Sequence, residues 1–485
     1  MMTPALSRRR ALVSGLACAA SLTPSTTMSQ TPPPPSSRQS PSSSPQSPPS
    51  FPRRRESTDA PAPPPPATTH LPWTRSANIY EVNIRQYTPE GTLNAFAAHL
   101  PRLRKMGVDI LWLMPIQPIG QVNRKGGLGS YYAVRDYSAV NPEFGTMADF
   151  KRLVAQAHAL GFKLILDWVA NHTAWDHPWA TDHKDFYKLD DKGEIFPVTF
   201  NAGTPQVEYW TDVVGLSYKT PALWDAMIEA MAFWVKEADI DGFRCDVAGL
   251  VPTPFWNRAR AELDAIKPMF MLAEWSEPDL HEQAFDMTYG WELTDELKKL
   301  AKGEADARAL RTWVQVPHVA KSGRSFPKSA YRMRFTSNHD ENSWHGHDAE
   351  LYGPAFKPMA VLAATLPGMP LIYGGQESGL HKRLAFFEKD AIDWKGYELA
   401  GFYADLLALK KANTALWNGQ YGGEVEVLSP APNGGSDGVF AFRRQAAGNV
   451  VTVAVNVSPR EQSVRLPGAE SSISLAPWGW KITAA

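Results

Sequence analysis

The chain has 485 residues, a formal net charge of −1 and 44% hydrophobic residues, enough for one large barrel with additions or about two to three ordinary domains. The near balance of charge predicts neither a nucleic-acid partner nor an anionic-membrane partner. Only two cysteines are present, Cys18 and Cys245, so a disulfide framework is excluded. Because Cys245 is isolated and the histidines lack ligand spacing, no zinc site is predicted.

The first 28 residues have the order of an export signal. The basic stretch Ser7-Arg8-Arg9-Arg10 precedes a short, mildly apolar run over 11–22. The paired arginines resemble a bacterial twin-arginine signal, so we expect an exported protein, periplasmic or extracellular. Gly15-Leu16-Ala17-Cys18 is an imperfect lipoprotein box, which leaves lipid anchoring through Cys18 as an alternative. A basic, disordered start with no targeting role is the other alternative.

Residues 29–70 consist mostly of proline and serine. A segment of this composition cannot bury a core, so it is predicted to be a disordered or polyproline linker. Folded structure is expected from Leu71 onward.

From residue 71 the hydrophobic pattern alternates between strands and helices, which is typical of parallel βαβ units. The predicted strands are 79–84, 108–114, 162–168, 239–249, 269–274, 284–287, 332–337 and 369–373. The predicted helices are 92–106, 147–160, 222–238, 254–266, 292–300, 354–365 and 397–412. This α/β pattern favours a (β/α)₈ TIM barrel, built from 71–172 and 220–412, over an open doubly wound sheet. No clear element is predicted for 303–329.

Two segments depart from this alternation. Residues 173–219 are rich in Trp, Asp and His and have no strong period, so they predict an irregular subdomain inserted after the third strand. Residues 413–485 contain short alternating runs separated by turn signals, which predict a C-terminal antiparallel β-domain. Its predicted strands are 424–428, 439–443, 450–455, 463–466 and 480–483.

The fourth predicted strand carries two charged residues, Arg244 and Asp246, in an otherwise apolar run. Residues two apart on a strand point to the same face, so these side chains are expected to be neighbours. Burying them costs several kcal/mol per ion unless they pair or are needed. One interpretation is a structural ion pair in the core. The other is a carboxylate whose pKa is lowered by the arginine, so that it acts as a nucleophile.

Other predicted strands also end in polar residues. Strand three runs into Asp167 and His172, strand five ends at Glu274, and strand seven runs into His339 and Asp340. Each residue alone has an ordinary explanation, as a cap or as a buried, hydrogen-bonded histidine. Because catalytic groups of such barrels gather at the carboxyl ends of the strands, the set together predicts an active site there.

The resemblance to a known family is carried by these same stretches. DWVANH (167–172), GFRCDVAGL (242–250), AEW (273–275) and FTSNHDEN (335–342) occur in this order, flanked by GVDILWLMP (107–115) and GMPLIYGGQE (368–377). In these motifs the chain resembles the α-amylase family of glycoside hydrolases, family 13, from about Trp73 to the carboxyl terminus. The resemblance implies the barrel, the inserted subdomain and a C-terminal antiparallel β-sandwich.

The resemblance also implies catalytic roles. Asp246 would be the nucleophile, Glu274 the general acid/base and Asp340 the third carboxylate. Hydrolysis with retention needs a nucleophilic carboxylate and an acid roughly 5–5.5 Å apart. The residues implied to bind substrate are Tyr132, Asp167, His172, Arg244 and His339, with Tyr132 stacked on the sugar at the cleavage site.

Three departures from the family pattern bear on metal and substrate. Gly249 and Leu250 stand where many members have a Lys-His pair, and Gly215-Leu216-Ser217 stands where an Asp-Leu-Asn with a calcium-binding Asp is common. Asn171, another family calcium ligand, is retained. A hard cation needs several oxygen ligands, so no cofactor is expected to be required, and calcium bound through Asn171 remains an open alternative. Ala133 replaces an Asp common in exo-acting α-glucosidases, which favours longer α-1,4-glucans as substrates.

The expected function is therefore a retaining α-glycoside hydrolase that cleaves α-1,4-glucosidic bonds in starch, glycogen or maltodextrins. One alternative is a related transglycosidase or cyclomaltodextrinase/neopullulanase, which would use the same carboxylates. A second is a carbohydrate-binding relative without catalysis. The expected partner is the α-glucan substrate.

Overall fold

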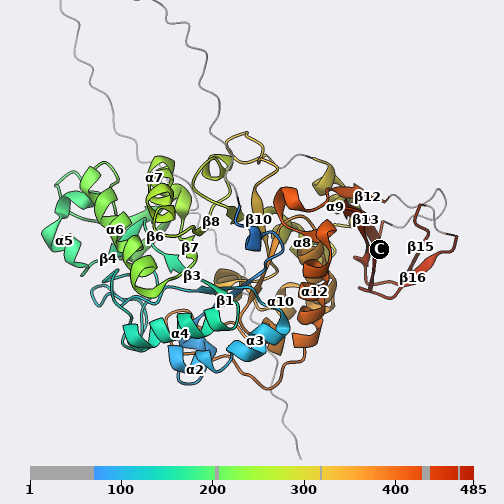
Figure 1. Ribbon diagram of the computed structural model, residues 1–485, viewed down its shortest axis with the longest axis horizontal. Coiled ribbons are helices and arrows are strands. Elements are labelled where there is room, and N and C mark those ends of the chain that lie inside the picture. The colour runs from blue at the N-terminus through green and yellow to red at the C-terminus, as the bar shows by residue number, and fades with distance from the viewer. Residues whose placement is uncertain (1–69, 202–206, 317–318, 429–436, 468–469) are drawn as a thin grey trace, which may run out of the picture. The chain divides into compact units, whose positions relative to one another are not determined.

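The computed structural model describes residues 70–201, 207–316, 319–428, 437–467 and 470–485 (Figure 1). The predicted export signal over 1–28, with Cys18, and the predicted linker up to residue 69 lie outside the described residues. Within the described ranges, none of the helices combines the length and the apolar character that a membrane crossing requires.

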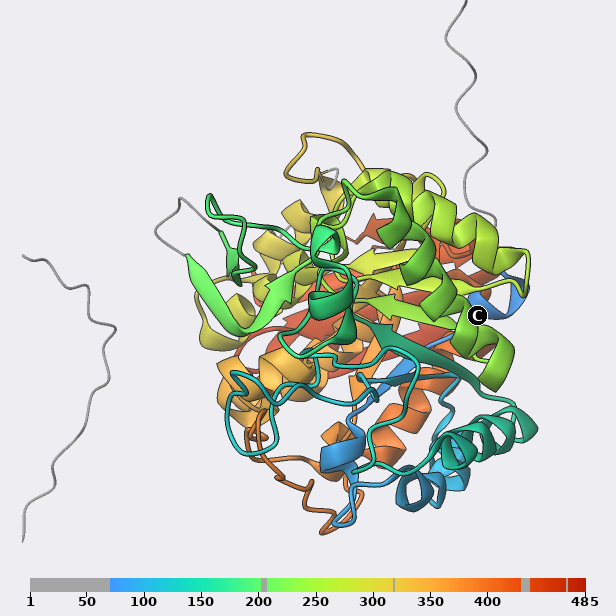
Figure 2. The same ribbon diagram turned by 90° about the vertical axis from the view of Figure 1, so that its left-hand side faces the viewer.

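Eight parallel strands close into a barrel, which confirms the predicted (β/α)₈ architecture. The ring closes because the first strand pairs on one side with the second and on the other with the last, as in Ile79 with Ile110 and Ile79 with Leu371. Helices surround these central strands (Figure 2). In the order of the ring, the strands are β1 (Ile79–Val82), β2 (Ile110–Leu113), β3 (Lys163–Trp168), β7 (Gly242–Cys245), β8 (Phe270–Ala273), β9 (Met287–Tyr289), β10 (Tyr331–Arg334) and β11 (Met369–Tyr373).

The barrel strands are buried on both faces, and alternate residues form two separate cores. Ile79, Ile165 and Leu272 belong to a cluster inside the barrel, whereas the residues between them pack outward with the helices. Side chains two residues apart on a strand point to the same face. The interior face therefore also includes the residues two positions after these three, which are Glu81, Asp167 and Glu274. The period of the strands thus directs these carboxylates into one space.

The helices cover the outside of the barrel, and two differ from the prediction. The predicted helix over 92–106 is broken into two, because Pro101 lacks an amide hydrogen and lies at the start of the second. Residues 303–329, for which no element was predicted, contain α9. The longer helices are α2 (Leu93–Ala97), α3 (Leu100–Met106), α4 (Met147–Ala159), α6 (Pro221–Ala238), α7 (Thr253–Asp264), α8 (Trp291–Lys302), α9 (Ala307–Gln315), α11 (Phe356–Thr365) and α12 (Ala400–Ala412). One-turn α-helices are α1 (Ile84–Tyr87), α5 (Pro178–Asp182) and α10 (Asp348–Leu351).

The segment inserted after β3 contains a small antiparallel sheet. Its strands are β4 (His172–Ala174), β5 (Pro197–Phe200) and β6 (Glu208–Gly215), with β6 in the middle. The irregular subdomain predicted after the third strand therefore contains a regular sheet, which the sequence pattern did not indicate. Since β4 begins at His172 and pairs with Gly215, the sheet starts directly at the carboxyl end of β3 and positions one wall of the site.

The C-terminal region is the predicted antiparallel β-domain. A four-stranded sheet of β12 (Val425–Val427), β13 (Val439–Ala446), β14 (Asn449–Asn456) and β17 (Trp480–Ala484) lies with a two-stranded sheet of β15 (Gln462–Val464) and β16 (Ile473–Leu475). One face of β13 packs with the barrel core through Phe440 and Phe442, and the other joins the small core between the sheets. The strand β16 was not predicted.

Candidate active site

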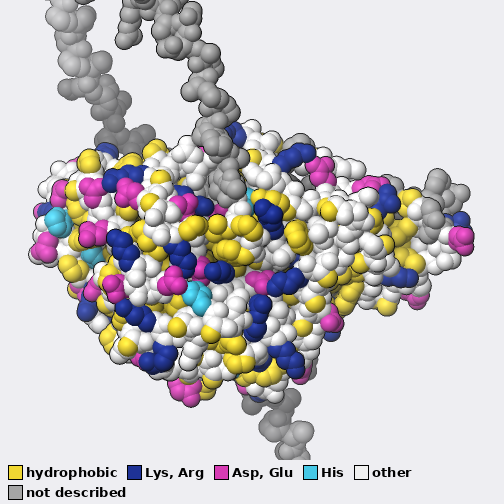
Figure 3. All heavy atoms as spheres, in the orientation of Figure 1, with side chains coloured by type: hydrophobic (Ala, Val, Ile, Leu, Met, Phe, Trp, Pro, Cys, Tyr) yellow, Lys and Arg dark blue, Asp and Glu magenta, His cyan; other side chains and the backbone are white. Residues whose placement is uncertain are grey.

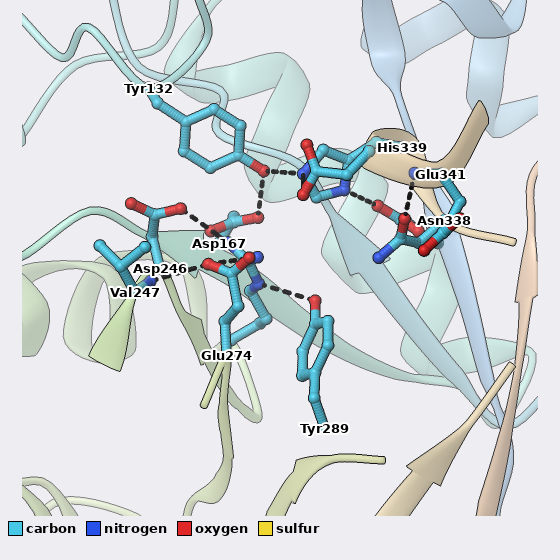
Figure 4. Close-up of polar contacts among 12 residues, drawn as sticks. Tyr132, Asp167, Asp246, Val247, Glu274, Tyr289, Asn338, His339 and Glu341 are labelled. Atoms are coloured by element: carbon cyan, nitrogen blue, oxygen red, sulfur yellow. Dashed lines mark hydrogen bonds and ion pairs between the residues drawn. The ribbon is translucent and has the colours of Figure 1, made fainter. Parts of the chain in front are cut away.

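A cavity of about 630 Å³ opens at the carboxyl ends of the barrel strands. Its walls come from the loops after β2, β3, β7, β8, β10 and β11 and from β6. The lining includes six of the eight predicted site residues, Tyr132, His172, Asp246, Glu274, His339 and Asp340. The other two, Asp167 and Arg244, are buried beneath it and contact these residues (Figure 4). Residues from five separate segments of the sequence therefore converge on one space.

Arg244 is the fully buried centre of the site. Its Nη1 lies 2.9 Å from Oδ1 of Asp167 and 3.2 Å from Oδ1 of Asp246, and its Nη2 lies 2.9 Å from Oε2 of Glu274. The guanidinium also lies over the Trp112 ring, with its carbon 5.0 Å from the ring centroid. One cation thus contacts three carboxyl groups. The interpretation of Arg244 and Asp246 as a buried ion pair is confirmed, and this pair lies inside the site itself.

The expected lowering of the pKa of Asp246 is not what the structure shows. Burial and the nearby carboxylates of Glu274 and Asp167 raise the pKa of Asp246 well above its ordinary value, although Arg244 opposes them. The sequence indicated that Arg244 lies beside Asp246, but it did not indicate that three carboxyl groups share this arginine. The carboxylates of this cluster therefore repel one another, and Arg244 offsets only part of that repulsion.

Glu274 is oriented by the backbone that follows Asp246. Its Oε2 accepts a hydrogen bond of 2.8 Å from the amide of Val247, in addition to the contact with Arg244. Val247 has a φ of +34°, in the left-handed region that β-branched residues rarely adopt. This turn directs the Val247 amide at Glu274, so the strain has a consequence for the positioning of the acid. Sequence analysis did not find Val247 as a positioning residue.

Tyr132 and Asp167 form a second layer of contacts. The Tyr132 hydroxyl donates to Oδ2 of Asp167 at 3.2 Å, and Trp112 Nε1 donates to the same oxygen at 3.1 Å. Burial raises the pKa of Asp167 to about 6, against the opposing effect of Arg244. These contacts fix the Tyr132 ring at the cavity, where its face is available for stacking on a sugar.

His339 is held by a residue that the sequence analysis did not select. Its Nδ1 lies 2.5 Å from Oε1 of Glu81 in β1, and its Nε2 lies 2.8 Å from the Tyr132 hydroxyl and 3.4 Å from Oδ2 of Asp340. Burial disfavours the imidazolium, but Asp340 and Glu81 outweigh it and raise the pKa of His339 to about 9. His339 is therefore charged at neutral pH. The available signal was a single acidic residue inside the buried strand 79–84.

His172 is neutral, in contrast to His339. Burial lowers the pKa of His172 to about 3. Its Nδ1 lies 3.1 Å from the side-chain nitrogen of Asn171, and its Nε2 lies 4.0 Å from Oδ2 of Asp246. If the Asn171 amide donates to Nδ1, the ring proton is on Nε2 and faces the nucleophile side of the cavity.

Asp340 lies at the rim of the cavity. Its side chain is 41% exposed, whereas those of Asp246 and Glu274 are 10% and 13% exposed. It follows β10 and directly precedes the turn Glu341–His345. An accessible carboxylate at this position can accept hydrogen bonds from sugar hydroxyls, as expected for the third carboxylate.

Two backbone carbonyls close to Asn171 already accept hydrogen bonds. The Asn171 carbonyl accepts from the Leu216 amide at 2.9 Å, and the Gly215 carbonyl accepts from the Lys188 amide at 2.9 Å. Among the described residues, no group of three or more His, Cys, Asp or Glu side chains is placed to hold a metal. Calcium bound through Asn171 stays an open alternative, and no step of the chemistry below depends on a metal.

The arrangement defines a class of protein: a (β/α)₈ barrel whose cavity presents convergent carboxylates at the strand ends, as in the glycoside hydrolases. Residues 48–398 match the family description "Alpha amylase, catalytic domain". The chain belongs to this family, the α-amylase family of glycoside hydrolases.

Relatives of the chain carry several activities in their names. An α-amylase, MalA, from Haloarcula japonica is 27% identical over 422 residues, covering 83% of this chain and 58% of the relative. An α-1,4-glucan:maltose-1-phosphate maltosyltransferase from Rhodospirillum rubrum is 28% identical over 388 residues, covering 70% and 51%. The chain thus spans little more than half the length of these two curated relatives.

Solved structures match over more of their length. An α-amylase from Lactobacillus plantarum superposes with a TM-score of 0.74 and 29% identity, covering 85% of this chain and 99% of that one. A maltogenic α-amylase, AmyB, from Thermotoga neapolitana gives a TM-score of 0.70 and 27% identity, covering 84% and 96%. The barrel, the inserted sheet and the C-terminal sheets together are therefore shared with these proteins.

Proposed function

We propose that the protein is a retaining α-glycoside hydrolase that cleaves α-1,4-glucosidic bonds in starch, glycogen or maltodextrins. The observation that carries the proposal is the contact of Arg244 with both Asp246 and Glu274 at the wall of one cavity. Family membership and the relatives named as amylases support the choice of substrate. On the face shown in Figure 3, charged side chains of both signs are interspersed, which suits an uncharged glucan.

In the first step Asp246 attacks the anomeric carbon while Glu274 protonates the leaving oxygen. The hydrogen bonds around Arg244 suit these two roles. Arg244 Nη1 donates an aligned hydrogen bond to Asp246, whereas Nη2 approaches Glu274 without hydrogen-bond alignment. Because a hydrogen bond from the guanidinium stabilises the charged form, it favours ionised Asp246. The Val247 amide takes Oε2 of Glu274, which leaves Oε1 to carry the proton.

In the second step water hydrolyses the glycosyl–Asp246 ester. Glu274, now deprotonated, accepts a proton from the water, and the product leaves with its original anomeric configuration. The positive charge of His339 is suited to hydrogen bonds with the sugar hydroxyls, and Tyr132 provides a stacking face. Every group that these steps require belongs to the chain, to the substrate or to the attacking water.

A digest of soluble starch and of maltoheptaose tests the proposal. Separation of the sugars should show shortened α-1,4-glucans with the α-configuration at the newly released end. Asp246→Asn should show none. Relatives named as maltosyltransferases support a second candidate, a transglycosidase. Added acceptor sugar distinguishes the two, because a transglycosidase makes elongated products at the expense of hydrolysis.

Export to the periplasm or the outside of the cell is a further part of the proposal. Its support is the order of basic, apolar and small residues over 1–28. Cell fractionation of the native chain and of a variant with Arg8→Lys and Arg9→Lys tests it, and the variant should be retained inside the cell. Release of the protein without detergent, unchanged in Cys18→Ala, would exclude the lipid anchor.

A further inference from the structure

Two loops meet beside the active-site cavity and are joined through their backbones. The amide of Gly127, in the loop after β2, donates to Glu388 Oε1 at 2.6 Å, and the amide of Leu128 donates to the carbonyl of Phe387 at 3.0 Å. A Cβ on Gly126 would lie 2.5 Å from Phe387 Cβ, so Gly126 must be small, and a Cβ on Gly127 would lie 2.6 Å from the Glu388 carboxylate. We call residues 125–129 and 386–388 the loop wall.

The loop wall is anchored from below by α1. Arg85, itself buried, donates to the carbonyls of Gly129 at 3.0 Å and Leu128 at 3.2 Å. Gln86 Nε2 donates to the carbonyls of Ala385 and Glu388, each at 2.8 Å. Since buried charged and amide groups are costly to leave unpaired, these contacts fix both loops. The loop wall is a built part of the fold.

The wall continues across the cavity to the inserted sheet. Lys125 Nζ lies 2.8 Å from Oδ1 of Asp212 in β6, and both residues line the cavity. The Asp212 side chain is only 6% exposed, so this ion pair is shielded from water more than a surface pair. Three separate segments, β6, the loop after β2 and the loop after β11, therefore form one continuous side of the site.

The position of the loop wall relative to Glu274 determines which end of a bound glucan faces the wall. Tyr132 stacks on Phe386 beside the wall, with ring centroids 6.2 Å apart and planes at 10°. Figure 4 shows Tyr132 and Glu274 on opposite sides of Asp167. Because Glu274 must contact the leaving oxygen, the leaving chain extends on its side. The sugar that is transferred to Asp246, together with any sugars on its non-reducing side, extends towards Tyr132 and the wall.

We infer that the loop wall closes the cavity at the non-reducing side, so that the enzyme is exo-acting: it takes free non-reducing ends of α-1,4-glucans and releases short products of one length. This inference rests on the proposed hydrolase function and specifies its substrate. A cavity of about 630 Å³ with a wall at one end accommodates a chain end rather than a chain passing through. Of the loop wall, Lys125, Phe386 and Phe387 line this cavity, and the Lys125–Asp212 ion pair joins the wall to β6.

Substrates without a free non-reducing end test the inference directly. We expect the full-length protein to cleave maltoheptaose at least about tenfold faster than maltoheptaose capped at its non-reducing end with a 4,6-ethylidene group. Early digests of the free substrate should contain one short product and its complement. β-Cyclodextrin, which has no end, should remain intact. Comparable rates on capped and free maltoheptaose, or rapid opening of the ring, would overturn the inference. No cleavage of any substrate would instead refute the hydrolase function itself.

A variant that opens the wall provides the matched test. The double change Lys125→Ala and Glu388→Ala removes the link to β6 and the contact to Gly127, so the ratio of free to capped rates should fall several-fold. The control is Lys151→Ala with Glu237→Ala, which removes a surface ion pair of 2.7 Å between α4 and α6 and should leave the ratio unchanged. Circular dichroism shows whether each variant is folded. Lys125→Ala alone, which removes only the link to β6, is a second variant for the same rate comparison. A folded wall variant with an unchanged ratio contradicts the inference.

Discussion

Glu81 Oε1 and His339 Nδ1, contributed by β1 and by the loop after β10, lie 2.5 Å apart beneath the active-site cavity. Both side chains are buried, so little water competes with the pair. The pair connects the barrel interior to the rim, because the other nitrogen of His339 contacts Tyr132 and Asp340. The charge of His339 therefore depends on a carboxylate that is not itself exposed to substrate.

Glu81→Gln should move the alkaline limb of the pH profile to lower pH. Glutamine can still accept a hydrogen bond from Nδ1 but lacks the charge that helps raise the pKa of His339 to about 9. Loss of an opposite charge at this distance shifts a pKa by about one unit or more. The measurement is kcat/KM on maltoheptaose between neutral and alkaline pH. Glu304→Gln, at an exposed position, is the control, and an identical limb in both variants would contradict the role of Glu81.

The same histidine makes stability depend on pH. Its folded pKa, about 9, lies above the ordinary value of 6.5. The stabilisation is therefore fully present below pH 6.5 and is lost as the pH rises through about 9. The melting temperature of the native protein should fall over this interval, and the melting temperature of the Glu81→Gln variant should fall by less. A melting temperature of the native protein that is flat across the interval would exclude the linkage.

Asp246→Asn should abolish hydrolysis and raise the melting temperature at pH 7. Loss of a nucleophile reduces kcat by a factor on the order of 10⁴ or more. The folded pKa of Asp246 is raised, so ionising this group at pH 7 destabilises the fold, and a neutral amide removes that cost. Steady-state kinetics and thermal unfolding measure the two effects. An inactive variant that melts lower than the native protein would contradict the electrostatic account, and retained turnover would contradict the nucleophile assignment.

The barrel could be predicted from the sequence because each of its signals is local. The last barrel strand is an apolar run between two glycines, and its predicted bounds, 369–373, are the observed ones. The strand predicted over 284–287 instead begins at Met287, because apolar residues also precede it in the loop. Local pattern identified the elements, and tertiary pairing set their ends.

The site was predictable only as a set of residue types at strand ends. Glu81 and His339 are 258 positions apart, and no local pattern indicates that they meet. The alternation of β1 places Glu81 inside the barrel, but its partner follows from the order of the closed ring. The predicted direction of the Asp246 pKa shift was wrong for a related reason. The sequence shows one arginine near Asp246 but does not show that Asp167 and Glu274 share this arginine.

Removal of calcium should leave the protein unchanged. The carbonyls of Asn171 and Gly215 accept hydrogen bonds from Leu216 and Lys188, and in the described part of the chain no group of three His, Cys, Asp or Glu side chains is placed to hold a metal. We therefore expect the same melting temperature and the same starch hydrolysis before and after treatment with EDTA, and no change when calcium is added back. A fall in melting temperature that calcium alone restores would support the calcium-ligand prediction for Asn171.

Arg244→Met should destabilise the fold strongly at neutral pH and less at low pH. Methionine keeps much of the apolar stem but removes the guanidinium that contacts Asp167, Asp246 and Glu274. Breaking a buried pair in this way costs about 3–5 kcal/mol, because buried charge is left uncompensated. Protonation of the carboxyl groups relieves that charge, so the loss should shrink as the pH is lowered.

Urea unfolding at pH 7 and pH 5 measures the effect of this change. The matched control is Arg443→Met on β13, whose exposed ion pair with Glu426, at 2.7 Å, should contribute little to stability at either pH because solvent screens it. If the two arginine variants lost equal stability, or if the loss in Arg244→Met did not depend on pH, Arg244 would not be the electrostatic centre of the site. The arrangement of Asp246 and Glu274 would then depend on packing alone.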